Sequence, residues 1–391
     1  MHKISGIRLA LVNLVTQTAL TRIKAPLVKS NKDAMIVSFA AALNKQGVAT
    51  DLFVSDAYKP ENNEDIGVNV YYLPTKWKRV FWPSCIPLTP GLIRMLKDRY
   101  DVVVCSELFQ IATVLAVIAK ILGRRKMKIV VWQEMARHQR IMGQLISKIY
   151  HAVVVRYFMD RHIDLYIPRG ELARRFLLSQ GIKEGKISDI IPHGVDADKF
   201  YYDPEVRKER YIISPSRLVY SKGVDVLLKA FEIVLKEIPD VRLIIQGDGP
   251  QLEEYKQLAK EARIDKQVIF STERISHNEM RQKYQRALVT VICSRKDLMI
   301  FSAMESLACG TPVIISNGAD SYTNYLDGKG GVVFASGDYS SLAGVISYLL
   351  KDDKYRKDMV GFALEKAKYY SNEYLSALFI ETISQKQGKS K

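Results

Sequence analysis

Apolar positions along the chain fall into short continuous runs that are separated by longer amphipathic segments. Uninterrupted apolar runs are typical of strands buried on both faces, and the segments between them have helical periodicity. In the first half, strands are expected at 7–12, 48–54, 68–73, 101–105, 128–132 and 163–167. Helices are expected at 33–46, 111–122 and 171–179, ending near Gly47, Gly123 and Gly181.

The second half repeats this alternation. Strands are expected at 210–214, 241–245, 268–270, 288–292, 313–315 and 332–334. Helices are expected at 224–237, 251–262, 278–286, 302–308 and 339–350. The pattern predicts two doubly wound α/β domains, in which ligands bind outside the carboxyl ends of the strands, with two such edges facing each other across a cleft.

A polar, charged passage at 202–210 is the best candidate for the linker between the halves. We therefore expect a first domain over 1–204 and a second over 205–371. The C-terminal helix, 372–386, is expected to pack back on the first domain.

The composition is that of a folded protein, because 48% of the 391 residues are hydrophobic and 26% are charged. The four cysteines fit no CxxC or zinc spacing, which favours reduced thiols and a cytoplasmic setting. The apolar stretch 7–14 is short for a signal peptide, and 111–122 is too short to span a bilayer.

The formal net charge of +16 indicates an anionic partner or surface. Nucleic acid ranks last, because no recognition helix, zinc finger or RNP-like strand is present. Basic residues interleaved with apolar ones occur at Arg137, Arg140, Lys148, Arg156, Arg161, Arg169, Arg174 and Arg175. This region is either a basic amphipathic surface for the inner face of an anionic membrane or a core-packed helix with a solvated basic side.

Two carboxylates stand eight positions apart in the segment 297–311, which is followed by an apolar strand. On one helix Asp297 and Glu305 would not share a face, so Asp297 is expected in the preceding loop and Glu305 within the helix. A helix N-terminus beside such a loop suits an anionic, hydroxyl-rich ligand such as a nucleotide-sugar. The alternative is an ordinary strand–loop–helix unit with two solvated acids.

Two basic residues, Arg217 and Lys222, lie between the first strand and the first helix of the second half. Together they can neutralise a diphosphate, or they are solvated loop charges. Gly247 and Gly249 follow the next strand and either make a turn or allow close approach to a ligand. His138 follows a first-domain strand and either faces a substrate or is a structural imidazole.

Other catalytic motifs are missing from the sequence. There is no P-loop, GxSxG elbow, HExxH site or convincing GxGxxG fingerprint. The pair Asp196 and Asp198 has the spacing of a metal motif but follows a turn. We expect neither a cofactor nor a metal, because Arg217 and Lys222 can supply the positive charge.

Five segments in order resemble the retaining family-4 glycosyltransferases of the GT-B fold, which has two Rossmann-like domains facing across a cleft. They are KISDIIPHGVDADKF (186–200), SRLVYSKGVDVLLKAF (216–231), VRLIIQGDGP (241–250), VIF (268–270) and the acid-x7-acid segment that runs into ESLACGTPVI (305–314). The resemblance covers roughly 160–370, and the first domain matches only in its alternation of elements.

The resemblance implies roles for residues of the second domain. Arg217 and Lys222 would bind the donor diphosphate, Glu305 the ribose, and Asp297 the transferred sugar. The backbone at Arg274 and Ile275 would contact the nucleobase of the donor. Further donor-binding residues would be Gly247, Gly249, Ile300, Phe301 and Ser302. Asp297 replaces the family's usual Glu and Ile300 its usual Gly, which bears on donor geometry.

The predicted function is that of a retaining, metal-independent glycosyltransferase. It would move a sugar from a nucleoside-diphosphate donor to a glycan or lipid-linked acceptor, in surface-polysaccharide or lipopolysaccharide assembly. The departures at Asp297 and Ile300 motivate an alternative, a catalytically impaired partner subunit that binds nucleotide-sugars or docks on membranes. A phosphorylase or a sugar-nucleotide epimerase is a weaker third interpretation.

Overall fold

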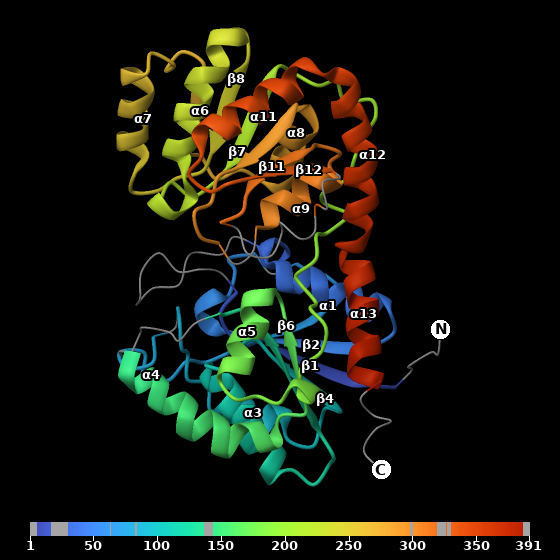
Figure 1. Cartoon of the computed structure of the whole chain (residues 1–391). Coiled ribbons are helices and arrows are strands. Elements are labelled where there is room, and N and C mark those ends of the chain that lie inside the picture. Colours follow the sequence, from blue (N-terminus) through green and yellow to red (C-terminus); the bar gives the residue numbers. More distant parts are fainter. Residues whose placement is uncertain are drawn as a thin grey trace. The chain divides into compact units, whose positions relative to one another are not determined.

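The computed structural model describes residues 6–16, 30–62, 64–82, 84–136, 144–297, 300–318, 326 and 330–385. The chain divides into two compact units, each with its own sheet (Figure 1). Unit 1 comprises Met1–His193 and Asn372–Lys391, and unit 2 comprises Gly194–Ser371.

Unit 1 is built on a six-stranded sheet in the order β3-β2-β1-β4-β5-β6, with every pairing parallel. Its strands are β1 (Arg8–Val12), β2 (Ala49–Ser55), β3 (Asn69–Leu73), β4 (Val102–Cys105), β5 (Lys128–Gln133) and β6 (Leu165–Pro168). Strands β4 and β6 are buried along their whole length and β5 at every residue except Lys128, which explains their continuous, largely apolar sequences.

The helices of unit 1 cover both faces of this sheet. They are α1 (Met35–Lys45), α2 (Gly91–Leu96), α3 (Ile111–Leu122), α4 (Gln144–Tyr150), α5 (Glu171–Ser179) and α13 (Asn372–Gln385). A π-helical segment, His151–Met159, directly continues α4. The last helix, α13, packs against α1 (Figure 1), where the Phe379 ring lies 5.6 Å from Phe39 and 5.3 Å from Trp132.

Unit 2 repeats the architecture with the order β12-β11-β10-β7-β8-β9, again entirely parallel. Its strands are β7 (Tyr211–Pro215), β8 (Arg242–Gln246), β9 (Val268–Ser271), β10 (Val289–Ile292), β11 (Val313–Ser316) and β12 (Gly331–Phe334). Its helices are α6 (Val224–Glu237), α7 (Leu252–Glu261), α8 (His277–Arg286), α9 (Phe301–Ala308), α11 (Tyr339–Lys351) and α12 (Asp353–Tyr369).

Each predicted strand is found within a few residues of its expected position, and the α/β class is confirmed. The sequence did not predict α2 or α12. Only Met359, Ala363 and Ala367 of α12 are buried, so its apolar pattern is too sparse to stand out. The segment 144–159 is helical, with one face in the core of unit 1 and the other exposed.

The first boundary between units lies at His193–Gly194, earlier in the chain than the expected 204–205. Packing explains the difference, because Val195 and Phe200 are buried in the core of unit 2 with Tyr211 and Tyr284. The polar passage that resembled a linker therefore follows residues that already belong to unit 2. Within the described residues, no helix is both long enough and apolar enough to cross a bilayer.

Candidate functional site

The order in which the chain adds strands to the sheet of unit 2 reverses between β7 and β10. These strands are hydrogen-bonded neighbours, yet the chain proceeds from β7 to β8 on one side and from β10 to β11 on the other. At such a point the loops after the two strands separate and leave a crevice. A pocket at this edge is lined by Ser214, Pro215, Ser216, Lys222, Ile292, Cys293, Ser294, Ile300 and Ser302. The cavity itself is small, about 30 Å³, so it has room for one small group of a ligand.

Lys222 and Asp297 form an ion pair at this pocket. Lys222 Nζ donates a hydrogen bond to Asp297 Oδ2, and Ser294 Oγ donates to the same oxygen at 3.3 Å. Both charged side chains are only 17% exposed. The sequence assigned Lys222 to a diphosphate and Asp297 to a sugar, and the structure brings the two residues together.

The loop that carries Arg217 and Lys222 is held in place by Arg295. Its guanidinium forms a two-point contact with Asp225, at 2.7 and 2.5 Å, and donates to the Tyr220 carbonyl at 2.8 Å. Burial opposes ionisation of Asp225, but the hydrogen bonds from Arg295 keep the pKa of its carboxyl below the ordinary value. Sequence reasoning missed this pair. The available signal was an arginine two positions before Asp297 and an acid in the first turn of α6.

Gly223 allows the Lys222 loop to contact the end of β10. Its φ is +66°, and a Cβ atom added there would lie 2.2 Å from the Cys293 carbonyl oxygen. Any larger residue would therefore be strained in its backbone and would collide with Cys293. This close contact sets the position of Lys222 next to the pocket.

The predicted residues Gly247 and Gly249 lie against the backbone of the loop 216–218. Added Cβ atoms would lie 2.1 Å from the Ser216 carbonyl oxygen and 2.4 Å from that of Leu218. The amide of Leu218 also donates to the Asp248 carbonyl at 2.9 Å. These contacts support the loop from behind and leave the Arg217 side chain exposed, with no hydrogen bond or ion pair to any residue in the described ranges.

Glu305 lies in α9 and accepts a hydrogen bond from the Tyr284 hydroxyl at 3.0 Å. Tyr284 is fully buried in the core of unit 2. Burial raises the pKa of Glu305 to about 7, and the hydrogen bond from Tyr284 acts in the opposite direction. Glu305 can therefore be ionised near neutral pH and accept hydrogen bonds from ligand hydroxyl groups. Sequence reasoning did not find Tyr284, because nothing in the spacing of α8 relates it to α9.

Ile300 precedes α9 and is buried in the core with Met304 while also lining the pocket. Its backbone is extended (φ −122°), a conformation that any residue can adopt, so the absence of glycine causes no strain here. Phe301 and Ser302 form the first turn of α9, and Ser302 lines the pocket.

Arg274 and Ile275 lie in the loop between β9 and α8, at the same edge of the sheet. This loop is tied to β8 by the Gln246 side chain, which donates to the carbonyls of Ser271 at 3.1 Å and Glu273 at 2.9 Å. The predicted donor-binding residues are thus distributed along the carboxyl edge from β10 to β9.

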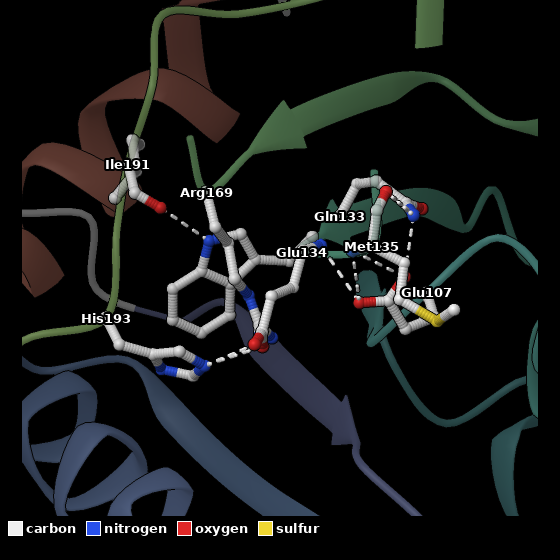
Figure 2. Close-up of polar contacts among 8 residues, drawn as sticks. Glu107, Gln133, Glu134, Met135, Arg169, Ile191 and His193 are labelled. Carbon is white, nitrogen blue, oxygen red and sulfur yellow. Dashed lines mark hydrogen bonds and ion pairs between the residues drawn. The ribbon is translucent and has the colours of Figure 1, made fainter. Parts of the chain in front are cut away.

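His138 lies outside the described residues. The structure instead gathers other polar residues at the carboxyl edge of unit 1 (Figure 2). Glu107 follows β4, Glu134 follows β5, Arg169 follows β6, and His193 ends the first of the two segments of unit 1. Sequence reasoning did not single out this group, because its members come from four distant segments and share no motif.

Arg169 occupies the centre of the unit 1 group. Its Nη1 donates to Glu134 Oε2 at 2.8 Å and also contacts His193 Nε2. Its guanidinium lies 4.2 Å from the Trp132 ring. Among the described residues, no group of three or more His, Cys, Asp or Glu side chains is arranged to hold a metal ion.

Residues 202–365 match the family model described as glycosyl transferases group 1. The GDP-mannose-dependent alpha-(1-6)-phosphatidylinositol monomannoside mannosyltransferase of Mycolicibacterium smegmatis is 30% identical over 181 residues, which are 42% of this chain and 47% of that protein. The alpha-monoglucosyldiacylglycerol synthase of Streptococcus pneumoniae is 32% identical over 192 residues, 45% of this chain and 42% of that protein. The matched residues thus span less than half the length of either relative.

Among solved structures, Anabaena HepE in complex with UDP superposes with a TM-score of 0.72 at 15% identity, covering 97% of this chain and 100% of that one. This likeness concerns the fold, and it confirms the predicted GT-B class with its two Rossmann-like domains. The family model covers most of unit 2, including the Lys222 loop, Glu305 and α9. Over residues 202–365, unit 2 is thus similar to the group 1 glycosyltransferases.

Proposed function

We propose that this protein is a retaining, metal-independent glycosyltransferase that uses a nucleoside-diphosphate-sugar. The observation that carries the proposal is the pocket at the β7–β10 switch point, where Lys222 lies on a loop that belongs to the matched family segment. Ligands of doubly wound sheets bind at such points. The UDP complex of a protein with the same fold supports a nucleotide donor.

Charge at the leaving group explains how this site would promote transfer. As the glycosidic bond breaks, negative charge develops on the departing nucleoside diphosphate, and fixed cations near it stabilise the transition state. Lys222 supplies one cation, and the exposed Arg217 on the same loop supplies another with a planar donor fork. These two residues would stabilise the negative charge on the departing diphosphate without a metal ion.

Retention of configuration requires either a protein nucleophile or attack from the face that the leaving group vacates. We assign Asp297 an orienting role and not that of the nucleophile, because its Oδ2 is held by both Lys222 and Ser294. We therefore propose front-face attack, in which a donor phosphate oxygen takes the proton of the acceptor hydroxyl. Asp297 would then orient Lys222 and contact the sugar.

For the acceptor, we propose a lipid-linked or glycan hydroxyl at an anionic membrane surface. The names of two relatives specify phosphatidylinositol mannoside and glucosyldiacylglycerol chemistry. The net charge of +16 also favours such a surface. The reaction would serve surface-polysaccharide or glycolipid assembly on the inner face of the cytoplasmic membrane.

The helical stretch 144–159 supports this docking. An outward helix face is normally polar, yet here it carries a stripe of exposed apolar side chains at intervals of four residues. These are Leu145, Ile149, Val153 and Tyr157. Exposed Lys148 and Arg156 lie on the same face, and no acidic residue occurs between 144 and 159. Apolar insertion combined with basic flanks is the chemistry of binding to an anionic lipid surface.

A donor screen tests the enzymatic proposal. Purified protein is incubated with UDP-, GDP- and ADP-sugars and with vesicles that contain diacylglycerol or phosphatidylinositol acceptors. We expect one donor to raise the melting temperature by mass action and to yield a glycolipid with the anomeric configuration of the donor. EDTA should not reduce the rate. An inverted product or a rate abolished by EDTA contradicts the corresponding part of the proposal.

A second candidate function is a nucleotide-sugar-binding partner subunit without transferase activity. Ile300 favours it, because its buried side chain lines the pocket where the related glycosyltransferases usually have glycine. Calorimetric binding of a donor, with neither transfer nor hydrolysis across the acceptor panel, would select this function over catalysis.

A further inference from the structure

The carboxyl edge of unit 1 carries a half-buried carboxylate that is fixed on one side and open on the other. Arg169 Nη1 donates to Glu134 Oε2 at 2.8 Å, whereas no described residue donates a hydrogen bond to Oε1. The Glu134 side chain is 34% exposed. Figure 2 shows the Glu134 carboxylate beside the guanidinium of Arg169, and Oε2 lies 3.8 Å from Nε2 of the His193 imidazole.

The residue that fixes Glu134 is itself deeply buried. Arg169 is 4% exposed, and its Nε and Nη2 have no hydrogen-bond partner within the part of the chain that the structure describes. Its guanidinium lies 4.2 Å from the ring of Trp132, which is fully buried. A buried guanidinium with unpaired N–H groups is costly, so its position is not explained by stability alone.

His193 helps to orient this arginine. Because a guanidinium can only donate, His193 Nε2 must be the acceptor in its contact with Arg169 Nη1. Burial and the neighbouring Arg169 lower the pKa of His193 well below its ordinary value, which keeps the imidazole neutral. The two Nη1 hydrogens are therefore shared between His193 and Glu134.

The backbone of Glu134 is fixed as well. Buried Glu107 accepts hydrogen bonds from the amide of Glu134 at 2.9 Å, the amide of Met135 at 3.2 Å and the Gln133 side chain at 2.6 Å. Glu107 has a φ of +91°, which is rare for a residue with a side chain. A strained, buried residue thus sets the direction in which the chain leaves β5.

We propose that Glu134 is a substrate-contacting residue, whose Oε1 accepts a hydrogen bond from a sugar hydroxyl, and that Arg169 is its positioning residue. This inference rests on the proposed glycosyltransferase function. A carboxylate repels phosphate, and pairing with Arg169 weakens its attraction for cations. Such a group remains a strong acceptor for neutral hydroxyl groups, which form short charge-assisted bonds with carboxylates.

The hydroxyl can belong to the acceptor or to the donor sugar, and kinetics of Glu134→Gln separates the two. The Gln side chain keeps an oxygen for Arg169 but offers an amide where Oε1 was. We expect the KM of the hydroxyl-bearing substrate to rise at least tenfold with a melting temperature within 1 °C of wild type. A higher acceptor KM assigns the hydroxyl to the acceptor. A higher donor KM, also seen in donor hydrolysis without acceptor, assigns it to the donor.

Glu171→Gln is the matched control, because Glu171 also pairs with an arginine, Arg175, and is similarly exposed (35%). It should leave both KM values unchanged. Arg169→Lys keeps the charge but loses the fork, so it should raise the same KM as Glu134→Gln. The double variant should be no worse than the more impaired single variant. Two independent structural roles would instead give additive losses.

Equal KM values for Glu134→Gln and Glu171→Gln would overturn the proposal. A readout without turnover separates this from failure of the proposed function. Titration with n-octyl α-D-glucoside and mannoside should broaden NMR signals of wild type more than those of Glu134→Gln. Suppose that a donor binds, that the glycosides broaden the signals of wild type and Glu134→Gln equally, and that both KM values are unchanged. The proposed Glu134 site is then wrong, and the proposed donor site is retained.

Suppose instead that no donor binds or reacts, but that the glycosides broaden the signals of wild type more than those of Glu134→Gln. The Glu134 site is then retained, and the proposed transferase function is wrong.

Discussion

Lys222 donates a hydrogen bond to Asp297, so the cation assigned to the donor diphosphate is paired with an anion of the same pocket. A diphosphate that binds Lys222 must share this cation with Asp297 or displace it. The pair therefore affects two properties of the site. It lowers the affinity for phosphate, and it positions Lys222, which stabilises the departing nucleoside diphosphate.

Replacing Asp297 with Asn should separate these two effects. Without the carboxylate, Lys222 is released and a repulsive charge is lost, so UDP or GDP should bind roughly three- to tenfold more tightly, corresponding to about 1 kcal/mol. Turnover should fall at least tenfold, because Lys222 loses its orientation. Isothermal titration with the nucleoside diphosphates measures the first effect.

The control for this variant is Asp240→Asn, which breaks the solvent-exposed pair of Asp240 with Arg210 on the same unit. This variant should change neither the affinity for nucleoside diphosphates nor the turnover rate. Weaker nucleotide binding by Asp297→Asn would mean that the carboxylate supports the phosphate site, contrary to this account.

Glu305 should make the stability of the protein depend on pH. Its folded-state pKa is raised from 4.5 to about 7, so its contribution is fully present below pH 4.5 and is lost as pH rises through 7. At about 1.4 kcal/mol per pH unit the loss is at most about 3–4 kcal/mol, and the partial solvent access of the side chain reduces it. Glu305→Gln should remove this loss, and urea unfolding at pH 5 and pH 8 measures it.

Glu253→Gln is the appropriate comparison for that experiment, because Glu253 lies on the exposed side of α7. The difference in unfolding free energy between Glu305→Gln and wild type should be more favourable to the variant at pH 8 than at pH 5. For Glu253→Gln this difference should be the same at both pH values. A pH profile identical in wild type and Glu305→Gln would show that Glu305 has an ordinary pKa.

Gly223→Ala should disrupt the Lys222 loop. The added methyl group meets the Cys293 carbonyl, and the left-handed backbone is unfavourable for alanine, so we expect a loss of about 2–3 kcal/mol. Gly344→Ala is a control within α11, where nothing lies within 4 Å, and it should stabilise by about 0.5–1 kcal/mol. Chemical denaturation measures both, and a Gly223 variant as stable as wild type would contradict the close contact.

The apolar stripe on the helical stretch 144–159 should control membrane binding. The double change Ile149→Glu and Val153→Glu replaces apolar insertion with repulsion, and it should weaken binding to phosphatidylglycerol vesicles at least tenfold. Val80→Glu provides a matched control, because Val80 is similarly exposed elsewhere on unit 1. Co-sedimentation measures the effect, and equal binding by both variants would place the docking surface elsewhere.

Sequence patterns predicted the strands well, because each is an uninterrupted apolar run in a parallel sheet. They placed Lys222 and Asp297 in loops that follow two strands of the second domain, and Glu305 in the helix after the second of these loops. They did not predict that Lys222 pairs with Asp297, because that contact depends on the path of two loops. The support that Arg295 gives to the loop was also missed, since Arg295 and Asp225 are 70 residues apart.

The unit 1 group was beyond sequence reasoning for a related reason. Glu107, Glu134, Arg169 and His193 become neighbours only when β4, β5 and β6 align and the chain returns past β6. The domain boundary was misplaced because charge and polarity at 202–210 resembled a linker, whereas burial of Val195 and Phe200 decides where unit 2 begins.

Nucleotide-sugar turnover by Lys222→Ala is the decisive test of a cation-stabilised leaving group in this pocket. Release of nucleoside diphosphate is measured with wild type and variant, at saturating donor and in the presence of acceptor vesicles, alongside their melting temperatures. We expect the variant to lose at least a hundredfold in rate while it remains folded. Wild-type rates from a folded Lys222→Ala protein would contradict the role of Lys222 at the leaving group.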